Sequence, residues 1–347
     1  MQFDHETAFS VLLLQAADEG RGPLLFGDSL QRARSLIPSF LIGEKFPEMY
    51  FEFPLKGEPF LDITLLYSEL SENEYVDSPL VSGCNDVMDF YRSIRADNDR
   101  ITCGFELDCS AQEIPSAAIH FQPRDFTELV IPFCQALGEA DRGKLYLAQN
   151  ERMPLGWELS YFGLFRGRPQ SPLRVCGYVS VEEKLACAED PAHLATVFAQ
   201  AGFEAFDDEL LSQASRLLAV APQEVDFQLD VYPDGSVGDI FAFDVSFVRK
   251  PDSKICASFM DGENAVLMSL LQEWGIVDDR IRCLPEMAFT RGLPQFQDDG
   301  SISKYGLSLI PGWMKVRWNK GVLQPAKMYM QVGAGPIIKK EDKDADN

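Results

Sequence analysis

The sequence predicts an α+β fold in which five ααββ repeats place ten antiparallel strands in a closed barrel surrounded by helices. Three observations lead to this prediction. The hydrophobic period alternates between about 3.6 and 2 residues, so amphipathic helices alternate with half-buried strands. The strands come in adjacent pairs joined by short loops such as PDGSVG and NKG, which is typical of antiparallel hairpins. Helices separate these pairs, usually two at a time, whereas a parallel α/β fold would alternate single strands with helices.

The elements follow from these periods in chain order. We predict helices, where apolar residues recur every three or four positions, at 5–19, 28–42, 83–97, 124–139, 141–151, 181–202, 207–220 and 262–275. Strands are predicted, where apolar and polar residues alternate, at 48–54, 60–67, 101–108, 116–122, 156–166, 172–180, 224–232, 238–248, 306–318 and 322–332. No break in composition suggests a linker, so residues 1–335 are predicted as a single domain. The charged end, 336–347, is predicted to be a disordered tail.

The predicted strands have one apolar face and one polar face. In strand 60–67, for example, Leu61, Ile63 and Leu65 oppose Asp62 and Thr64. The polar faces of four other strands carry Glu106, Arg174, Cys176, Tyr178, Gln228, Asp230, Tyr232, Asp244 and Ser246. An open sheet with water on its polar side would explain the alternation. Aromatic residues on the polar face favour a closed barrel, because ten strands enclose a lumen wide enough for a ligand.

Composition excludes several classes of function. The chain of 347 residues has 31 Lys and Arg against 54 Asp and Glu, a net charge of -23, which argues against general nucleic-acid binding. It has no apolar run long enough to span a membrane, and its start lacks the cationic region of a signal peptide. Nucleotide-binding loops and the G-x-S-x-G pattern of serine hydrolases are absent from the sequence.

The eight cysteines form no C-x-x-C pair and have no zinc-ligand spacing with a histidine. They are interpreted as buried reduced thiols, which predicts a cytoplasmic protein with no tightly bound metal. The sequence does not indicate an oligomeric state.

The most unusual segment is 313–332, WMKVRWNKGVLQPAKMYMQV, which holds four cations and no acid in a strongly acidic chain. Its Asn319-Lys320-Gly321 sequence suits a three-residue hairpin loop with Gly321 in the left-handed conformation. That hairpin aligns one polar face, which consists of Trp313, Lys315, Arg317, Lys327, Tyr329 and Gln331. The opposite face is apolar and is predicted to pack against helices.

Five ααββ units with a polar lumen resemble the ABBA, or PT-barrel, prenyltransferases over about residues 5–332. Two local patterns are similar to strand motifs of the dimethylallyltryptophan synthase branch, namely Lys315-Val316-Arg317-Trp318 and Lys327-Met328-Tyr329. The segment from Pro59 to Thr64 resembles the acceptor-binding strand of that branch, and Glu158-Leu159-Ser160 matches its Glu-x-Ser tripeptide better but falls in the third unit. Asp230 and Asp244 depart from the family, which usually has further cations there.

The resemblance implies a prenyl diphosphate donor and an aromatic or peptide acceptor. Lys and Arg would stabilise the departing diphosphate, aromatic faces would stabilise the allylic cation, and a carboxylate would orient the nucleophile. Asp62, Glu106 and Glu158 are therefore the candidate catalytic residues. The candidate substrate-binding residues are Arg174, Tyr178, Tyr232, Trp313, Lys315, Arg317, Lys327, Tyr329 and Gln331.

The absence of D-D-x-x-D predicts at most assistance from Mg²⁺, held between the diphosphate and Asp62, Glu106 or Asp244. Excess cations in a dry lumen would be costly until a ligand balances them. Two other functions fit the same residues. One is a non-catalytic barrel that binds a peptide or an anionic metabolite, and the other is an interaction scaffold with an open sheet.

Overall fold

The computed structural model describes residues 4–17, 20–42, 45–67, 75–76, 78–80, 84–95, 101–111, 113, 116–123, 126–168, 170–247, 261–296 and 302–337. Residues 338–347, most of the predicted tail, lie outside these ranges. In the described parts of the chain, no helix is both long and apolar enough to cross a bilayer.

Ten antiparallel strands form a closed barrel, which confirms the predicted fold class. In chain order they are β1 (Glu48–Pro54), β2 (Asp62–Tyr67), β3 (Thr102–Leu107), β4 (Ala118–Gln122), β5 (Trp157–Leu164), β6 (Leu173–Val179), β7 (Val225–Val231), β8 (Val237–Ser246), β10 (Ile302–Asn319) and β12 (Lys327–Pro336). Strands β1 to β8 pair consecutively, β8 pairs with β10, β10 pairs with β12, and β12 pairs back to β1. The order of the ten strands is the order predicted from sequence.

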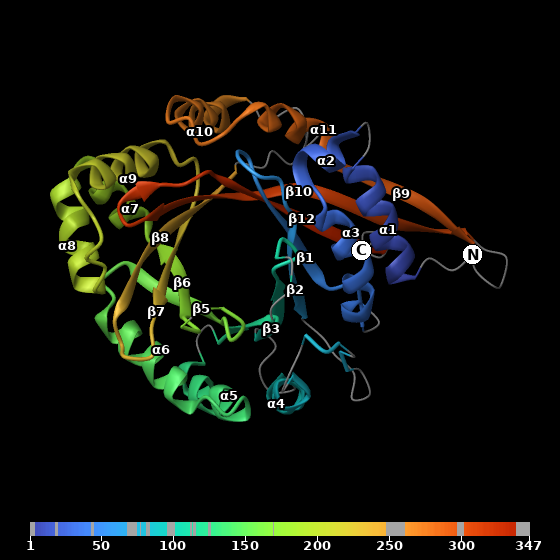
Figure 1. The fold of residues 1–347 in the computed structure, drawn as a ribbon, viewed down its shortest axis with the longest axis horizontal. Helices are drawn as coiled ribbons and strands as arrows, with labels where there is room; N and C mark the ends of the chain where they lie inside the picture. The colour runs from blue at the N-terminus through green and yellow to red at the C-terminus, as the bar shows by residue number, and fades with distance from the viewer. Residues whose placement is uncertain are drawn as a thin grey trace, which may run out of the picture.

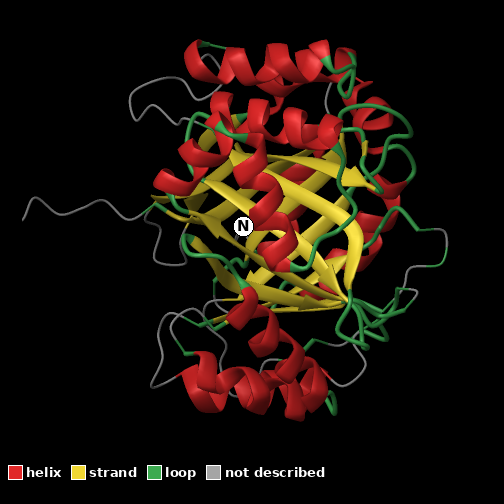
Figure 2. Cartoon of the chain, turned by 90° about the vertical axis from the view of Figure 1, so that its left-hand side faces the viewer, coloured by secondary structure: helices red, strands yellow, loops and turns green. Residues whose placement is uncertain are grey.

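The helices lie outside the strands (Figures 1 and 2). They are α1 (His5–Ala16), α2 (Arg21–Phe26), α3 (Ser29–Leu36), α4 (Cys84–Arg95), α5 (Val130–Ala136), α6 (Ala140–Arg152), α7 (Val181–Glu189), α8 (Pro191–Ala201), α9 (Asp208–Val220), α10 (Gly262–Glu273) and α11 (Leu284–Met287). Short 3₁₀ turns occur at η2 (Ile37–Phe40), η3 (Thr127–Leu129) and η4 (Asp279–Cys283). Among the described residues, the number of α-helices before each strand pair varies from one to three, so the repeat is less regular than predicted.

The hydrophobic core fills the layer between the outer face of the barrel and the helices. Large side chains from the strands, including Phe51, Phe105, Phe162, Phe227 and Trp318, are fully buried there. They pack with apolar residues of the helices in one continuous cluster. Because the apolar faces of the strands are used for this layer, the polar faces are left to line the lumen.

The predicted helix 181–202 is two helices in the structure. Pro191 has no N–H to donate to a preceding turn, and it disfavours the helical conformation for the residue before it. Asp190 accordingly has extended backbone angles, and its side chain accepts a hydrogen bond from the Ala192 N–H at the start of α8. The break turns α8 back along α7.

One strand was missed by the sequence analysis. Strand β9 (Phe289–Phe296) pairs with the first half of β10, outside the closed ring of ten. It contains Gly292 and Pro294, which normally argue against a strand. A proline is tolerated here because β9 lies at the edge of the sheet.

The loop of the C-terminal hairpin has two residues and not three. Asn319 pairs with Val322, a residue of the short strand β11 (Val322–Leu323). Lys320 and Gly321 both have positive φ, 51° and 75°. This is the geometry that a tight two-residue hairpin turn requires, and the left-handed conformation predicted for Gly321 is observed.

A β-bulge at Gly312 determines which residues of β10 enter the lumen. The pairing register with β12 shifts between Pro311 and Trp313. Before the bulge, odd-numbered residues such as Leu307 and Leu309 are buried in the core. After it, even-numbered residues such as Met314 and Val316 are buried there instead. Without the extra residue, Trp313 and the cations that follow would face the helices.

Candidate functional site in the barrel lumen

Among the described residues, the barrel lumen and the adjoining loops line three hollows that are linked by shared residues. The inner chamber, with a volume of about 170 Å³, is lined by Tyr50, Thr64, Leu66, Glu106, His120, Gln122, Tyr161, Arg174, Cys176, Asp226, Gln228, Asp244, Trp313, Lys315 and Tyr329. A wide pocket of about 670 Å³ is lined by residues that include Arg32, Lys56, Phe60, Arg317 and Lys327. Between them lies a constriction of about 40 Å³ that shares Arg317 and Lys327 with the wide pocket and Glu106, Arg174, Gln228 and Lys315 with the inner chamber.

The C-terminal hairpin contributes both aromatic and cationic groups to these hollows. The rings of Trp313 and Tyr329 stack, with centroids 4.9 Å apart and planes 15° from parallel. The Lys315 ammonium lies 4.6 Å from the centroid of the Tyr329 ring and donates a hydrogen bond of 2.5 Å to its hydroxyl. Cross-strand pairing of Trp313 with Tyr329 and of Lys315 with Lys327 produces this arrangement.

Lys327 and Tyr329 both contact the carboxylate of Glu52 on β1. The Lys327 ammonium donates to one oxygen of Glu52, and the Tyr329 hydroxyl donates to the other. Burial opposes ionisation of Glu52, but the charges of Lys327 and Lys315 lower its pKa to about 2. Burial and the Glu52 charge raise the pKa of Tyr329 well above its usual value, so the phenol stays protonated.

Two arginines at the constriction are also paired with carboxylates. Arg174 forms a two-point contact with Asp230, with Nε–Oδ1 and Nη2–Oδ2 distances of 2.9 and 3.3 Å. The Arg168 Nη2 lies 2.8 Å from Glu106 Oε1 and 2.6 Å from Asp108 Oδ1. Burial opposes the shift, but the hydrogen bond from His120 and the charge of Arg168 hold the pKa of Glu106 well below its usual value.

Arg317 differs from the other lumen cations. Within the described residues, its guanidinium has no hydrogen-bond or ion-pair partner, although its side chain lines both the wide pocket and the constriction. Burial and the charge of Arg174 lower its pKa. Arg174 and Lys327 are thus balanced by carboxylates of the protein, contrary to the expectation that the lumen cations await a ligand. For Arg317 that expectation stays a prediction.

Acidic groups line the inner chamber beside the hairpin, on β7 and on β8, where Asp244 is the cross-strand partner of Lys315. Asp226 and Asp244 face each other across β7 and β8. Burial and their mutual repulsion raise the pKa of Asp226 to about 7, and burial raises that of Asp244 to about 6 against the charge of Lys315. Asp244 Oδ1 and Trp313 Nε1 are buried without a hydrogen bond within the described parts of the chain. Such groups are unusual in native structures and suit a chamber that takes a polar ligand.

The structure brings together most of the predicted site residues. Glu106, Arg174, Trp313, Lys315, Arg317, Lys327 and Tyr329 all line the connected hollows. Asp62 is buried beside Glu52, its cross-strand partner, and accepts a hydrogen bond from the Ser110 N–H at 3.0 Å. Burial and the Glu52 charge raise its pKa to about 7.

Four predicted residues do not line these hollows. Glu158 and Tyr178 are cross-strand neighbours and hydrogen bond to each other, and the Tyr178 side chain is 42% exposed. Gln331 donates to Glu48 at 3.2 Å, and Tyr232 follows the last residue of β7. Glu158, Tyr178 and Gln331 keep the predicted polar strand face, but none of the four residues lines the hollows.

Several lumen residues were missed by the sequence analysis. Glu52 could have been found, because Glu48, Tyr50 and Glu52 alternate with Met49, Phe51 and Phe53 in a strand whose faces were not assigned. Arg168 gave no such signal. It lies in the loop between β5 and β6, where strand alternation does not apply, and only the fold brings it to Glu106 and Asp108.

No protein-family model matches the sequence, and a comparison with curated proteins also finds no match. Solved structures do match across the whole fold. The crystal structure of 5-dimethylallyltryptophan synthase from Streptomyces coelicolor superposes with a TM-score of 0.53 at 10% identity, over 95% of this chain and 97% of that one. The same enzyme in complex with DMASPP and Trp gives 0.52 at 10% identity, with 98% and 99% coverage.

The apo form of the prenyltransferase PriB gives a TM-score of 0.51 at 11% identity, over 95% of this chain and 96% of that one. At such identities the likeness concerns the fold and not individual residues. Together with the closed ring of ten strands, it confirms the architectural resemblance that the sequence predicted. This chain has the ABBA, or PT-barrel, fold of the aromatic prenyltransferases.

Proposed function

We propose that this protein transfers a prenyl group from an allylic prenyl diphosphate to an aromatic acceptor and releases pyrophosphate. One observation carries the proposal. Arg317 is a lumen cation with no partner among the described residues, and it stands with Lys327 where the wide pocket meets the constriction. The fold of the neighbours, one of which is in complex with DMASPP and Trp, supports the same assignment.

The diphosphate is proposed to bind at this junction, held by Arg317 and Lys327. Charge-assisted hydrogen bonds to a multiply charged anion are among the stronger ones available to a protein, and enclosure strengthens them further. The prenyl group would then extend past Lys315 into the inner chamber, which is bordered by the stacked rings of Tyr329 and Trp313.

In the proposed reaction, the bond between the allylic carbon and the diphosphate oxygen breaks, and both electrons leave with the oxygen. An electron pair of the acceptor forms the new bond to the allylic carbon. The faces of Tyr329 and Trp313 would stabilise the intermediate cation by electrostatic attraction and would exclude water from it.

The acceptor must finally lose a proton. Glu106 is held ionised and can orient an acceptor N–H or O–H by accepting its hydrogen bond. Asp226 and Asp244 are better suited to take the proton, because their pKa values of about 7 and 6 lie near neutral pH. Since the side-chain cations meet the diphosphate, Mg²⁺ is proposed to assist at most.

The small inner chamber favours a short prenyl group, so we expect dimethylallyl diphosphate to be preferred over geranyl diphosphate. Because Glu106, Asp226 and Asp244 line the same chamber, the acceptor ring is proposed to meet the allylic carbon there, and the wide pocket leaves room for the rest of a peptide acceptor.

The test is to incubate the purified protein with each diphosphate and a panel of tryptophan, tyrosine and peptides that contain them, with Mg²⁺ and with a chelator. Mass spectrometry should show an acceptor heavier by one prenyl group, and a coupled assay should show equimolar pyrophosphate. Arg317→Ala serves as the matched control. Binding of the diphosphate without any pyrophosphate release would favour a non-catalytic binding barrel, and absence of binding would refute both functions.

A further inference from the structure

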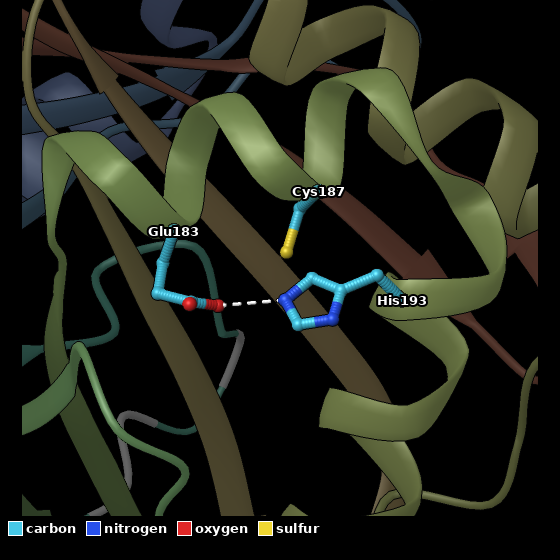
Figure 3. Close-up of side chains that lie close together, drawn as sticks. All are labelled: Glu183, Cys187 and His193. Atoms are coloured by element: carbon cyan, nitrogen blue, oxygen red, sulfur yellow. Dashed lines mark hydrogen bonds and ion pairs between the residues drawn. The ribbon is translucent and has the colours of Figure 1, made fainter.

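A second cluster of reactive side chains lies on the helical layer, outside the barrel. Glu183 and Cys187 belong to α7, and His193 belongs to α8. One ligand atom from each of the three residues lies within 4.8 Å of the others. Figure 3 shows the Glu183 carboxylate joined to the His193 imidazole while the Cys187 sulfur points toward the same ring. The Glu183 Oε2 to His193 Nε2 distance is 2.9 Å.

The local sequence explains why these side chains converge. Glu183 and Cys187 are four residues apart, so they occupy the same face of α7. The break at Asp190 and Pro191 then folds α8 back, which returns His193 to that face. Neither step follows from a Cys and His spacing that the sequence analysis could have recognised.

Glu183 does not form the capping-box hydrogen bond that its position in α7 would allow. Ser180 and Glu183 have the spacing of a capping box, in which the glutamate would accept a hydrogen bond from the Ser180 N–H. Here that N–H donates to the Gly156 carbonyl at 2.7 Å instead. A side chain at Gly156 would place its Cβ 2.5 Å from Glu183 Cγ, so glycine leaves the space that the glutamate stem occupies.

The donor set has the composition of a zinc site. Thiolate, imidazole and carboxylate are the three ligand types that Zn²⁺ takes in proteins, and three protein ligands with a water in the fourth position is a common arrangement. Cys187 is fully buried, whereas the side chains of Glu183 and His193 are 23% and 39% exposed. An ion could therefore reach the cluster from solvent past the histidine and glutamate.

We propose that Glu183, Cys187 and His193 bind one Zn²⁺ ion, which links α7 to α8 and completes its coordination with water. Tetrahedral zinc lies about 2.0–2.3 Å from its ligand atoms. The three donor atoms are already within 4.8 Å of one another, so small side-chain movements would bring them to an ion placed between them. This proposal departs from the sequence expectation of no tightly bound metal. It does not depend on prenyl transfer, since the cluster contains none of the residues that line the lumen.

The test uses the reduced, metal-free full chain and Co²⁺, which replaces Zn²⁺ in tetrahedral sites and reports on thiolate ligands by its absorption. We expect a sulfur-to-cobalt charge-transfer band that saturates at one equivalent per chain and disappears when Zn²⁺ is added. Cys187→Ser should abolish the band. His193→Gln should weaken Co²⁺ binding at least ~tenfold. Replacing a residue that only hydrogen bonds to a metal ligand already lowers metal affinity by about that factor, and His193 is proposed to be a ligand itself.

Cys283→Ser is the matched control, because it removes a thiol elsewhere and should leave the band intact. His193 is partly exposed, so His193→Gln is expected to fold even if Cys187→Ser does not, and thermal unfolding of each metal-free variant checks this. Zn²⁺ should raise the Tm of the wild type but not of His193→Gln. If Co²⁺ produces no charge-transfer band, or if His193→Gln binds as tightly as the wild type, the cluster is an interhelical hydrogen bond beside an inert thiol and the proposal fails.

Discussion

Glu52 and Lys327 form an ion pair across β1 and β12 at the constriction of the lumen, and the same carboxylate accepts a hydrogen bond from Tyr329. The pair is largely shielded from water, with side-chain exposures of 5% for Glu52 and 19% for Lys327. A bound diphosphate would have to share Lys327 with this carboxylate. The lysine therefore has a structural role in addition to the binding role proposed for it.

Lys327→Ala is expected to lower the free energy of unfolding by ~1–3 kcal/mol, because it leaves the ionised Glu52 buried without its cation. Urea denaturation measures the loss. The double variant Lys327→Ala/Glu52→Gln removes the unpaired charge and should recover part of it. Equal stabilities of the wild type and Lys327→Ala would show that the pair contributes nothing.

Arg317→Ala is expected to weaken prenyl diphosphate binding ~10- to 100-fold, as loss of a charge-assisted hydrogen bond of ~1.5–3 kcal/mol implies. Its Tm should change little, because the guanidinium has no protein partner to lose within the described residues. Isothermal titration with dimethylallyl diphosphate measures the affinity. Arg282→Ala, at an exposed site on η4, is the control and should bind as the wild type does. Wild-type affinity in Arg317→Ala would remove this residue from the site.

Tyr329→Leu is expected to lower kcat more than diphosphate affinity if the ring stabilises the allylic cation. A cation–π contribution of ~0.5–2 kcal/mol corresponds to a roughly 2- to 30-fold loss in rate. Tyr329→Phe keeps the ring and should retain more turnover. Tyr178→Leu should have a smaller effect than Tyr329→Leu, because Tyr178 is half-exposed and hydrogen bonded to Glu158. Single-turnover kinetics separates the two parameters, and a larger loss at Tyr178 would relocate the reaction.

The stability of the protein should depend on pH through Asp226. Its pKa is about 7 in the folded state and about 4 in an unfolded chain, so between these values the folded state binds the extra proton. Stability should consequently fall as the pH rises from about 4 to 7. In Asp226→Asn the drop in Tm between pH 5 and pH 8 should be smaller than in the wild type. Asp239→Asn, at an exposed position of β8, should leave the drop unchanged, and an identical drop in Asp226→Asn would contradict the assignment.

Met328→Asp is expected to prevent stable folding, although Met328 adjoins Lys327 in sequence. Met328 is fully buried in the core between the barrel and its helices, where an aspartate would be an unpaired buried charge. Circular dichroism and size-exclusion chromatography measure the loss. Met328→Leu preserves volume and should cost less than ~1.5 kcal/mol. A folded Met328→Asp protein would show that the faces of β12 have been assigned the wrong way round.

The sequence by itself determined the architecture and the faces of the strands. Alternation of period 2 is strictly local, so it is enough to place Lys315, Lys327 and Tyr329 on the polar face of the C-terminal hairpin. Adjacent strands joined by short loops have few arrangements other than antiparallel hairpins. Each of the ten strands has one apolar face, and in a closed barrel these faces pack against helices that lie outside. The same reasoning failed at β9, because Gly292 and Pro294 hide a strand that tertiary pairing holds in place.

The tertiary structure alone decided how deep each residue sits and which charges meet. Glu158 and Arg174 both lie on the lumen-facing side of their strands, yet only Arg174 reaches the constriction, because depth depends on strand tilt and register around the whole barrel. The neutralisation of Arg174 by Asp230 and the approach of Arg168 from a loop likewise join residues from different units. Local periodicity carries no information about such contacts, since their partners are fixed by the closure of the ring and not by neighbours in the chain.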